Sequence, residues 1–175
     1  MICYSTQHTK HYLGFREHFM KIAVFADVQN IYYTTKEMHG RPFNYKKLWA
    51  DLSEEGEITH AFAYAIDRGI DSQIKFQDAL RNIGFDVKLK PFIQRRDGSA
   101  KGDWDVGITI DIMECTPDVD LVVLLSGDGD FAILLNKIRD KWQVKSRVYG
   151  VEFLTANGLI QSTDEFVNID REMLM

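Results

Sequence analysis

Residues 119–131, VDLVVLLSGDGDF, join the most hydrophobic stretch of the chain to a pair of acids. Leu121 to Leu125 form an uncharged apolar run, which is typical of a strand buried on both faces of a parallel sheet. Two aspartates, Asp128 and Asp130, follow with a single glycine between them. Carboxylates this close repel each other, so we expect a positive charge to lie between them.

The rest of the chain alternates segments typical of strands with segments typical of helices. Strands are predicted at residues 22–26, 58–66, 85–92, 119–125 and 144–151, and helices at 30–38, 45–52, 71–84 and 130–142. In the helix over 71–84 the spacing directs Ile74, Leu80 and Ile83 inward, and Gly84 ends the helix. The alternation predicts an α/β fold of three layers, with a mainly parallel sheet covered on both faces.

Residues 105–113, DVGITIDIM, fit both a strand and a helix. Alternating apolar residues favour a strand, whereas Val106, Ile110 and Met113 have helical spacing. Two parallel strands need a crossover connection, which is usually a helix, and this segment lies between two predicted strands. We therefore predict a helix here on topological grounds.

Length and composition are those of one soluble globular domain, with 175 residues, 45% hydrophobic and 27% charged. Residues 1–20 show no clear period and lack the apolar core of a signal peptide, so we predict an N-terminal extension before a domain at 21–175. His8 and His11 in that extension lack the carboxylate or cysteine partner of a metal site.

The sequence also predicts a cytoplasmic protein without a membrane partner. No apolar run approaches the length that spans a bilayer. The two cysteines, Cys3 and Cys115, have no metal-ligand spacing, and so few thiols indicate a reducing compartment.

Four aspartates are expected at the carboxyl edge of the sheet, where ligands bind in open parallel sheets. Asp27 follows the first predicted strand, Asp128 and Asp130 follow the strand at 119–125, and Asp105 begins the crossover helix. Helix N-capping is the alternative role for each aspartate taken singly. Because no lysine or arginine adjoins Asp27, Asp128 or Asp130, a divalent cation, Mg²⁺ or Mn²⁺, best explains the group.

Four motifs, FADVQN, KGDWDVGITIDIM, LLSGDGDF and LIQSTDEFVNID, resemble those of the NYN domain (LabA-like) proteins, a branch of the PIN-like nucleases. The resemblance runs from residue 21 to 170 with the motifs in order. It implies a Rossmann-like (PIN-like) sheet and a metal-dependent ribonuclease. By this resemblance the strand-end aspartate of the family falls on Asp27, its partner asparagine on Asn30, and the S-G-D-x-D pair on Asp128 and Asp130.

The K-G motif leaves a choice between two aspartates. KGDWD is one residue longer than the common K-G-x-D, so Asp103 rivals Asp105, although the apolar residue after Asp105 and the later Asp111 favour Asp105. Because six helical residues turn the chain by about 600°, Asp111 lies on another face and is assigned a supporting or structural role. Asp164 matches a family position at which we expect packing or capping.

The resemblance predicts hydrolysis of phosphodiester bonds in single-stranded or looped RNA. Cations held by Asp27, Asp105 and Asp128 would activate a water molecule and neutralise the leaving oxygen, with Asp130 completing the metal shell. Asn30 would donate a hydrogen bond to the scissile phosphate or accept one from a water on the metal.

Residues 88–101, KLKPFIQRRDGSAK, form a basic segment in a chain whose net charge is -5. Its cations are Lys88, Lys90, Arg95, Arg96 and Lys101, against one acid, Asp97. Lys101, Arg95 and Arg96 are expected to position the RNA backbone, and an ordinary solvated loop is the alternative.

Tyr32 and Tyr33 are candidates for stacking on RNA bases, with half-buried packing as the alternative. A haloacid-dehalogenase-like phosphatase is a rival reading of SGDGDF, but that family needs an aspartate where FADVQN has Gln29. A receiver domain is weaker still, because the acidic pair after its first strand is absent. The non-enzymatic rival is a PIN-like domain that binds RNA or protein without cutting.

Overall fold

The computed structural model describes residues 19–91, 93–94, 100–101 and 103–175. Its central sheet has six strands, all parallel, in the order β3-β2-β1-β6-β7-β8. The strands are β1 (Met20–Asp27), β2 (Gly56–Asp67), β3 (Asp86–Pro91), β6 (Leu121–Leu125), β7 (Lys145–Gly150) and β8 (Glu165–Asn168). The predicted α/β class and parallel sheet are confirmed.

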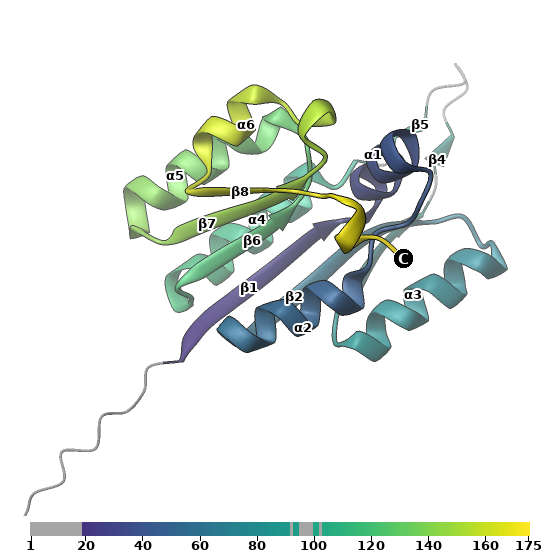
Figure 1. Cartoon of the computed structure of the whole chain (residues 1–175), viewed down its shortest axis with the longest axis horizontal. Helices are drawn as coiled ribbons and strands as arrows, with labels where there is room; N and C mark the ends of the chain where they lie inside the picture. The colour runs from purple at the N-terminus through teal and green to yellow at the C-terminus, as the bar shows by residue number, and fades with distance from the viewer. Residues whose placement is uncertain (1–18, 92, 95–99, 102) are drawn as a thin grey trace, which may run out of the picture.

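Helices cover both faces of this sheet and make the three predicted layers (Figure 1). One face carries α1 (Val28–His39), α2 (Tyr45–Glu55) and α3 (Asp71–Ile83). The other face carries α4 (Asp105–Cys115), α5 (Ala132–Trp142) and α6 (Asn157–Ser162). The architecture is Rossmann-like, as the parallel strands and intervening helices require.

The order of strands reverses between β1 and β6, in the middle of the sheet. From β1 the chain proceeds through β2 to β3 at one edge, and from β6 through β7 to β8 at the other. Ala26 of β1 pairs with Leu125 of β6, so Asp27 and Ser126 follow at neighbouring positions. Connections that diverge from adjacent strand ends leave a crevice between them, which is where open parallel sheets bind ligands.

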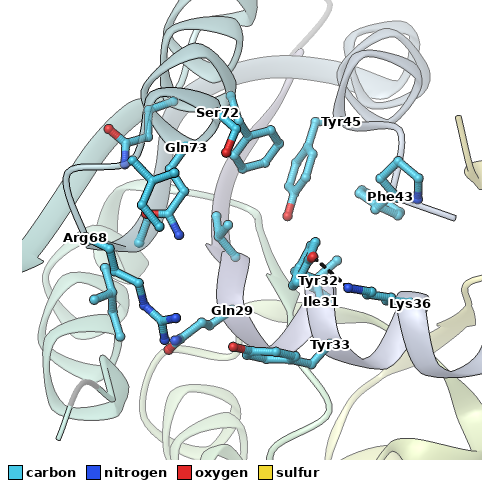
Figure 2. Close-up of a pocket in the computed structure, with 17 residues that line it drawn as sticks. Gln29, Ile31, Tyr32, Tyr33, Lys36, Phe43, Tyr45, Arg68, Ser72 and Gln73 are labelled. Carbon is cyan, nitrogen blue, oxygen red and sulfur yellow. Dashed lines mark hydrogen bonds between the residues drawn. The ribbon is translucent and has the colours of Figure 1, made fainter. Parts of the chain in front are cut away.

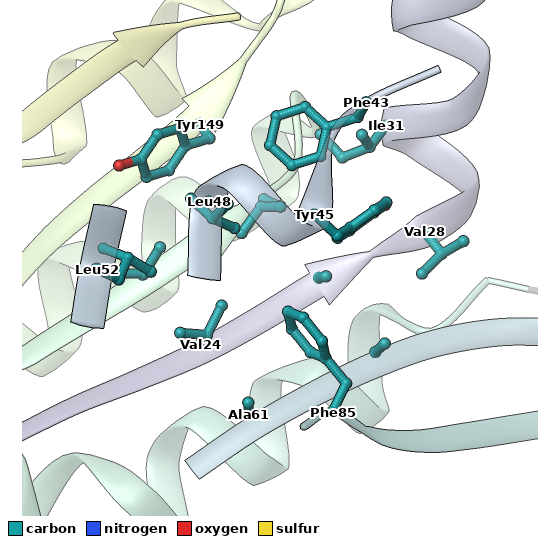
Figure 3. Close-up of a cluster of buried hydrophobic side chains, with 14 of the residues drawn as sticks. Val24, Val28, Ile31, Phe43, Tyr45, Leu48, Leu52, Ala61, Phe85 and Tyr149 are labelled. Atoms are coloured by element: carbon teal, nitrogen blue, oxygen red, sulfur yellow. The ribbon is translucent and has the colours of Figure 1, made fainter. Parts of the chain in front are cut away.

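The two sheet faces bury separate hydrophobic cores. Within β1, Val24 packs in the core beneath α1, α2 and α3, whereas Phe25 packs in the core beneath α4 and α5. Figure 3 shows the first core, in which Val24 lies with Leu48 and Leu52 of α2. Because successive strand residues point to opposite faces, a fully apolar strand is needed to supply both cores.

The segment 105–113 is a helix, which confirms the topological prediction. Ile108 and Ile112 are fully buried, one helical turn apart, whereas Val106 and Ile110 are 69% and 51% exposed. The helix therefore divides the strand-like series of apolar residues between the core and the surface.

The prediction for Ile74 is wrong, because its side chain is 44% exposed. Only the later turns of α3 reach the core, where Leu80 is buried, and its first turns border an open pocket. Gly84 ends α3 with a φ of 131°, and a Cβ atom there would lie 2.5 Å from the ring of Trp49. A residue with a side chain would therefore meet both backbone strain and a clash.

Sequence patterns predicted neither α6 nor β8, which have only six and four residues. They also missed an antiparallel pair of two-residue strands, β4 (Ile93–Gln94) and β5 (Ala100–Lys101). Segments this short carry too few residues to establish a period.

Residues 1–18 of the predicted N-terminal extension, with His8 and His11, lie outside the described residues, and the domain boundary stays a prediction. Within the described part of the chain, no helix is both long enough and apolar enough to cross a bilayer.

Candidate metal centre

Asp27 is the last residue of β1 and caps the helix that follows. Its Oδ1 accepts a hydrogen bond from the backbone N–H of Asn30 at 3.1 Å, so the capping role is real. The pKa of Asp27 is raised to about 6, chiefly by burial. The Asn30 N–H opposes this rise, and the charges of Asp105 and Asp128 add to it. Like-charge repulsion is therefore present at this end of the sheet, but desolvation is the larger cause.

The loop after β6 is held in place by its own polar groups. The buried Ser126 Oγ accepts from the backbone N–H of Asp128 at 3.2 Å, and Asp128 Oδ1 accepts from the N–H of Asp130 at 2.9 Å. Asn30 Oδ1 accepts from the N–H of Gly127 at 2.9 Å. Asn30 thus joins the start of α1 to this loop, which leaves its NH₂ group to donate to a ligand.

Gly127 and Gly129 are required by close packing rather than by backbone freedom. Neither glycine has a positive φ. A Cβ atom on Gly127 would lie 2.9 Å from the carbonyl oxygen of Leu154, and one on Gly129 would lie 2.9 Å from Cβ of Ala156. The acidic loop therefore rests directly against residues 154–156, and any larger residue would displace it.

Asp105 opens α4 and is positioned by its neighbour Trp104. The Trp104 indole donates to the carbonyl oxygen of Ala65 at 2.9 Å, which fastens the start of α4 to the end of β2. Burial raises the pKa of Asp105, and the charges of Asp128 and Asp103 raise it further. Lys90 acts in the opposite direction, and its Nζ donates to the carbonyl oxygen of Asp103 at 2.9 Å.

Asp105, Asp128 and Asp130 form a compact acidic cluster. One carboxylate oxygen from each lies within 4.8 Å of the others, and Asp103 does not belong to this set. None of the ion pairs formed among the described residues involves these three acids or Asp27. Three hard oxygen donors that form no ion pair with a described residue suit Mg²⁺ or Mn²⁺. Asp27 stands beside this acidic cluster, to which it is coupled electrostatically.

Two further aspartates have structural partners. Asp111 Oδ2 accepts from the Tyr64 hydroxyl and from Lys88 Nζ, both at 2.6 Å. Asp164 Oδ2 accepts from the backbone N–H of Ser146 at 2.8 Å, near the start of β7. Both aspartates therefore stabilise the fold away from the acidic cluster.

The basic segment divides into parts with different roles. Lys88 is occupied by Asp111 and lies over the ring of Phe62 at 4.4 Å, so it does not join a basic surface. Lys90 is the cation that acts on Asp105. Arg95 and Arg96 lie outside the described residues, and for Lys101 only the backbone of β5 is described.

Tyr32 and Tyr33 lie at the surface of α1 with about half of each side chain exposed, which is compatible with base stacking and with half-buried packing alike. Their side chains are 47% and 53% exposed, with ring centroids 5.4 Å apart in an edge-to-face arrangement. Lys36 Nζ donates to the Tyr32 hydroxyl at 3.2 Å. The two rings are therefore available to a ligand on the carboxyl side of the sheet.

Comparisons with known proteins find a matching family model and two similar proteins. A family model, the NYN domain, matches residues 21–170, which include the whole acidic cluster. The chain is 27% identical over 158 residues to the low amplitude and bright protein LabA of Synechococcus elongatus, covering 86% of this chain and 84% of that protein. It is 50% identical to a protein of unknown function from Vibrio parahaemolyticus, whose crystal structure superimposes with a TM-score of 0.86 over 91% of this chain and 98% of that one.

Proposed function

The chain belongs to the NYN domain family, and on that premise we propose that it is a metal-dependent endoribonuclease acting on single-stranded or looped RNA. The observation that carries the proposal is the acidic cluster of Asp105, Asp128 and Asp130 at the crevice between β1 and β6. These carboxylates form no ion pair with a described residue, and such a cluster is costly to hold together unless a cation neutralises it.

The four acids would share the binding of Mg²⁺ or Mn²⁺. Asp105, Asp128 and Asp130 offer one oxygen each, and Asp27 offers a further carboxylate from the end of β1. When bound, such a cation supplies Lewis acidity that lowers the pKa of a water molecule and offsets charge on the leaving oxygen. Asn30 keeps the Gly127 loop in register with β1 and directs its amide NH₂ group to a phosphate oxygen.

RNA would reach this site along a surface that combines cations and aromatic rings. Tyr32 and Tyr33 are exposed and suit stacking on unpaired bases. Arg95, Arg96 and Lys101 would contact the phosphates beyond the site.

The basic segment predicts a defined salt dependence for RNA binding in EDTA. If it makes about three phosphate contacts, the slope of log Kobs against log salt concentration is expected to be about -2, since single strands release about 0.7 counterions per contact. Replacing Arg95 and Arg96 by alanine is expected to flatten this slope. The measurement is a fluorescence anisotropy titration at several salt concentrations, and an unchanged slope would make residues 88–101 an ordinary solvated loop.

The direct test of the proposed function is an assay on end-labelled single-stranded RNA. We expect internal cleavage in Mn²⁺ or Mg²⁺ and intact RNA in EDTA, resolved on a denaturing gel. Calorimetry with Mn²⁺ alone, on wild type and Asp128→Asn, measures the cation site separately from turnover. Cation binding without cleavage, combined with tight RNA binding, would instead identify a regulatory domain that binds RNA without cutting it.

A further inference from the structure

A pocket of about 620 Å³ opens on the side of β1 that carries α1, α2 and α3 (Figure 2). Its walls come from the first turns of α1, the start of α2, the end of β2 and the first turns of α3. The volume lies within the range of pockets that enclose small organic ligands. The chemistry proposed for the acidic cluster does not involve the residues deep in this pocket.

One buried polar atom of the pocket lacks a partner, and two further polar side chains line the same space. Gln73 Oε1 is buried and has no hydrogen-bond partner among the described residues. Gln77 is only 4% exposed, and no described residue makes a hydrogen bond with its side-chain amide. The Tyr45 hydroxyl likewise has none within the described part of the chain, and in Figure 2 it points into the pocket. A buried polar atom without a partner is costly, so Gln73 Oε1 indicates a ligand that supplies the missing hydrogen bond, and the Gln77 amide and the Tyr45 hydroxyl can bond to the same ligand.

The remaining lining residues restrict the chemistry of that ligand. Aromatic rings of Tyr33, Phe43 and Phe76 border the same space as the amides of Gln73 and Gln77. Aromatic walls favour a flat unsaturated ring, which stacks on them. A carboxamide carries a donor and an acceptor side by side, and this pair matches the edge of a nucleobase. A lipid or a sugar would leave one of these two features unused.

The pocket is also connected to the acidic cluster through the backbone. Val28 and Gln29, which line it, directly follow Asp27. Ala65 lines it as well, and its carbonyl oxygen accepts the hydrogen bond from Trp104, the residue before Asp105. The lining of the pocket is therefore joined to Asp27 through the chain and to the start of α4 through one hydrogen bond.

From this geometry we propose that the pocket is a nucleobase-binding subsite. Gln73, Gln77 and Tyr45 hydrogen-bond the edge of one base, and Tyr33 stacks on it. The proposal rests on the proposed function, because it takes the base to belong to an unpaired nucleotide of the RNA substrate. A free mononucleotide presents the same chemistry, and the experiment below distinguishes the two sources.

The test measures binding in EDTA, where no cleavage is needed. Labelled short oligonucleotides that differ in base composition, and the four free nucleoside monophosphates, are titrated against wild type, Gln77→Met and Tyr33→Ala. Gln77→Met keeps the length of the side chain but removes both hydrogen-bonding groups, and Tyr33→Phe is the control that keeps the ring. Gln161→Met makes the same change as Gln77→Met on the exposed surface of α6. Tyr45→Phe removes one hydroxyl from the pocket and replaces Gln77→Met in the titrations if that variant does not fold.

Wild type is expected to prefer one base, and Gln77→Met and Tyr33→Ala are expected to bind that oligonucleotide about tenfold more weakly and to lose the preference. Gln161→Met and Tyr33→Phe are expected to match wild type. The same losses confined to mononucleotides would identify a free nucleotide as the source. Binding by wild type that ignores the base, or equal binding by all variants to both kinds of ligand, would overturn the proposal. Cleavage in Mn²⁺ is measured separately. If the protein binds RNA with a base preference but does not cleave it, the proposed function fails and the nucleobase subsite stands. If the protein cleaves RNA but shows no base preference, the subsite fails and the proposed function stands.

Discussion

Asp128→Asn is expected to lower kcat/KM for Mn²⁺-dependent RNA cleavage by about 10²- to 10³-fold, the size of effect seen when one preorganised electrostatic group is removed from a transition state. The substitution exchanges a carboxylate of the acidic cluster for a neutral amide. An asparagine at this position still offers an oxygen to the backbone N–H of Asp130, so the loop is expected to keep its structure. Asp27→Asn is expected to act in the same direction.

The matched control for this prediction is Asp118→Asn. Asp118 is an exposed residue of the short helix η1 (Thr116–Asp118), which precedes β6 at the opposite end of the strand. The Asp118→Asn substitution makes the same change of charge but lies away from the acidic cluster, so the rate of cleavage is expected to stay within about twofold of wild type. Initial rates on labelled single-stranded RNA measure all three variants. Equal losses in all of them would contradict the assignment of the site.

Asp27→Asn is expected to stabilise the metal-free protein at alkaline pH, even as it lowers the rate of cleavage. The pKa of Asp27 is 3.8 in the unfolded reference and about 6 in the folded protein, so the folded state binds this proton more tightly. Above about pH 6 the charged carboxylate therefore opposes folding by about 3 kcal/mol at most. Asparagine removes that penalty and keeps the hydrogen bond from Asn30.

The pH dependence gives this prediction its sharpest form. Wild-type unfolding free energy in EDTA is expected to fall as pH rises from about 4 to 6, because deprotonation of Asp27 costs more in the folded state. The gain in unfolding free energy from Asp27→Asn is expected to be largest near pH 8. It is expected to decrease as the pH falls from about 6 to 4 and to vanish below about pH 4. Urea denaturation of both proteins at several pH values measures it. A variant that is less stable than wild type at pH 8 would mean that helix capping by the charged carboxylate outweighs its desolvation.

Cation binding is the second arm of the same measurement. Mn²⁺ binds the folded state preferentially and is expected to raise the wild-type free energy of unfolding. Asp27→Asn lacks one of the proposed donors, so its gain from Mn²⁺ is expected to be smaller. An equal gain in both proteins would remove Asp27 from the cation site.

Local patterns were sufficient to predict the class of fold and the edge at which the acids gather. The run Leu121 to Leu125 is apolar at every position because both faces of β6 are buried, and this is visible in the sequence. Asp27 ends β1 and Asp128 lies three residues after β6, so the parallel arrangement alone brings them to one edge. The helical state of 105–113 also followed from topology, although its own apolar pattern favoured a strand.

Only the tertiary structure decided which side chains meet, because contacts between distant segments leave no periodic signal in a single sequence. Lys88 belonged to a basic segment in the sequence, and only the fold gives it Asp111 as a partner. Gly127 owes its lack of a side chain to Leu154, which a later loop brings within contact distance. The pocket is the clearest case, since Tyr33, Tyr45 and Gln77 come from three different helices. Tyr33 was a stacking candidate in the sequence, but no pattern there marked Tyr45 or Gln77, and only the packing of the three helices brings these side chains to one shared space.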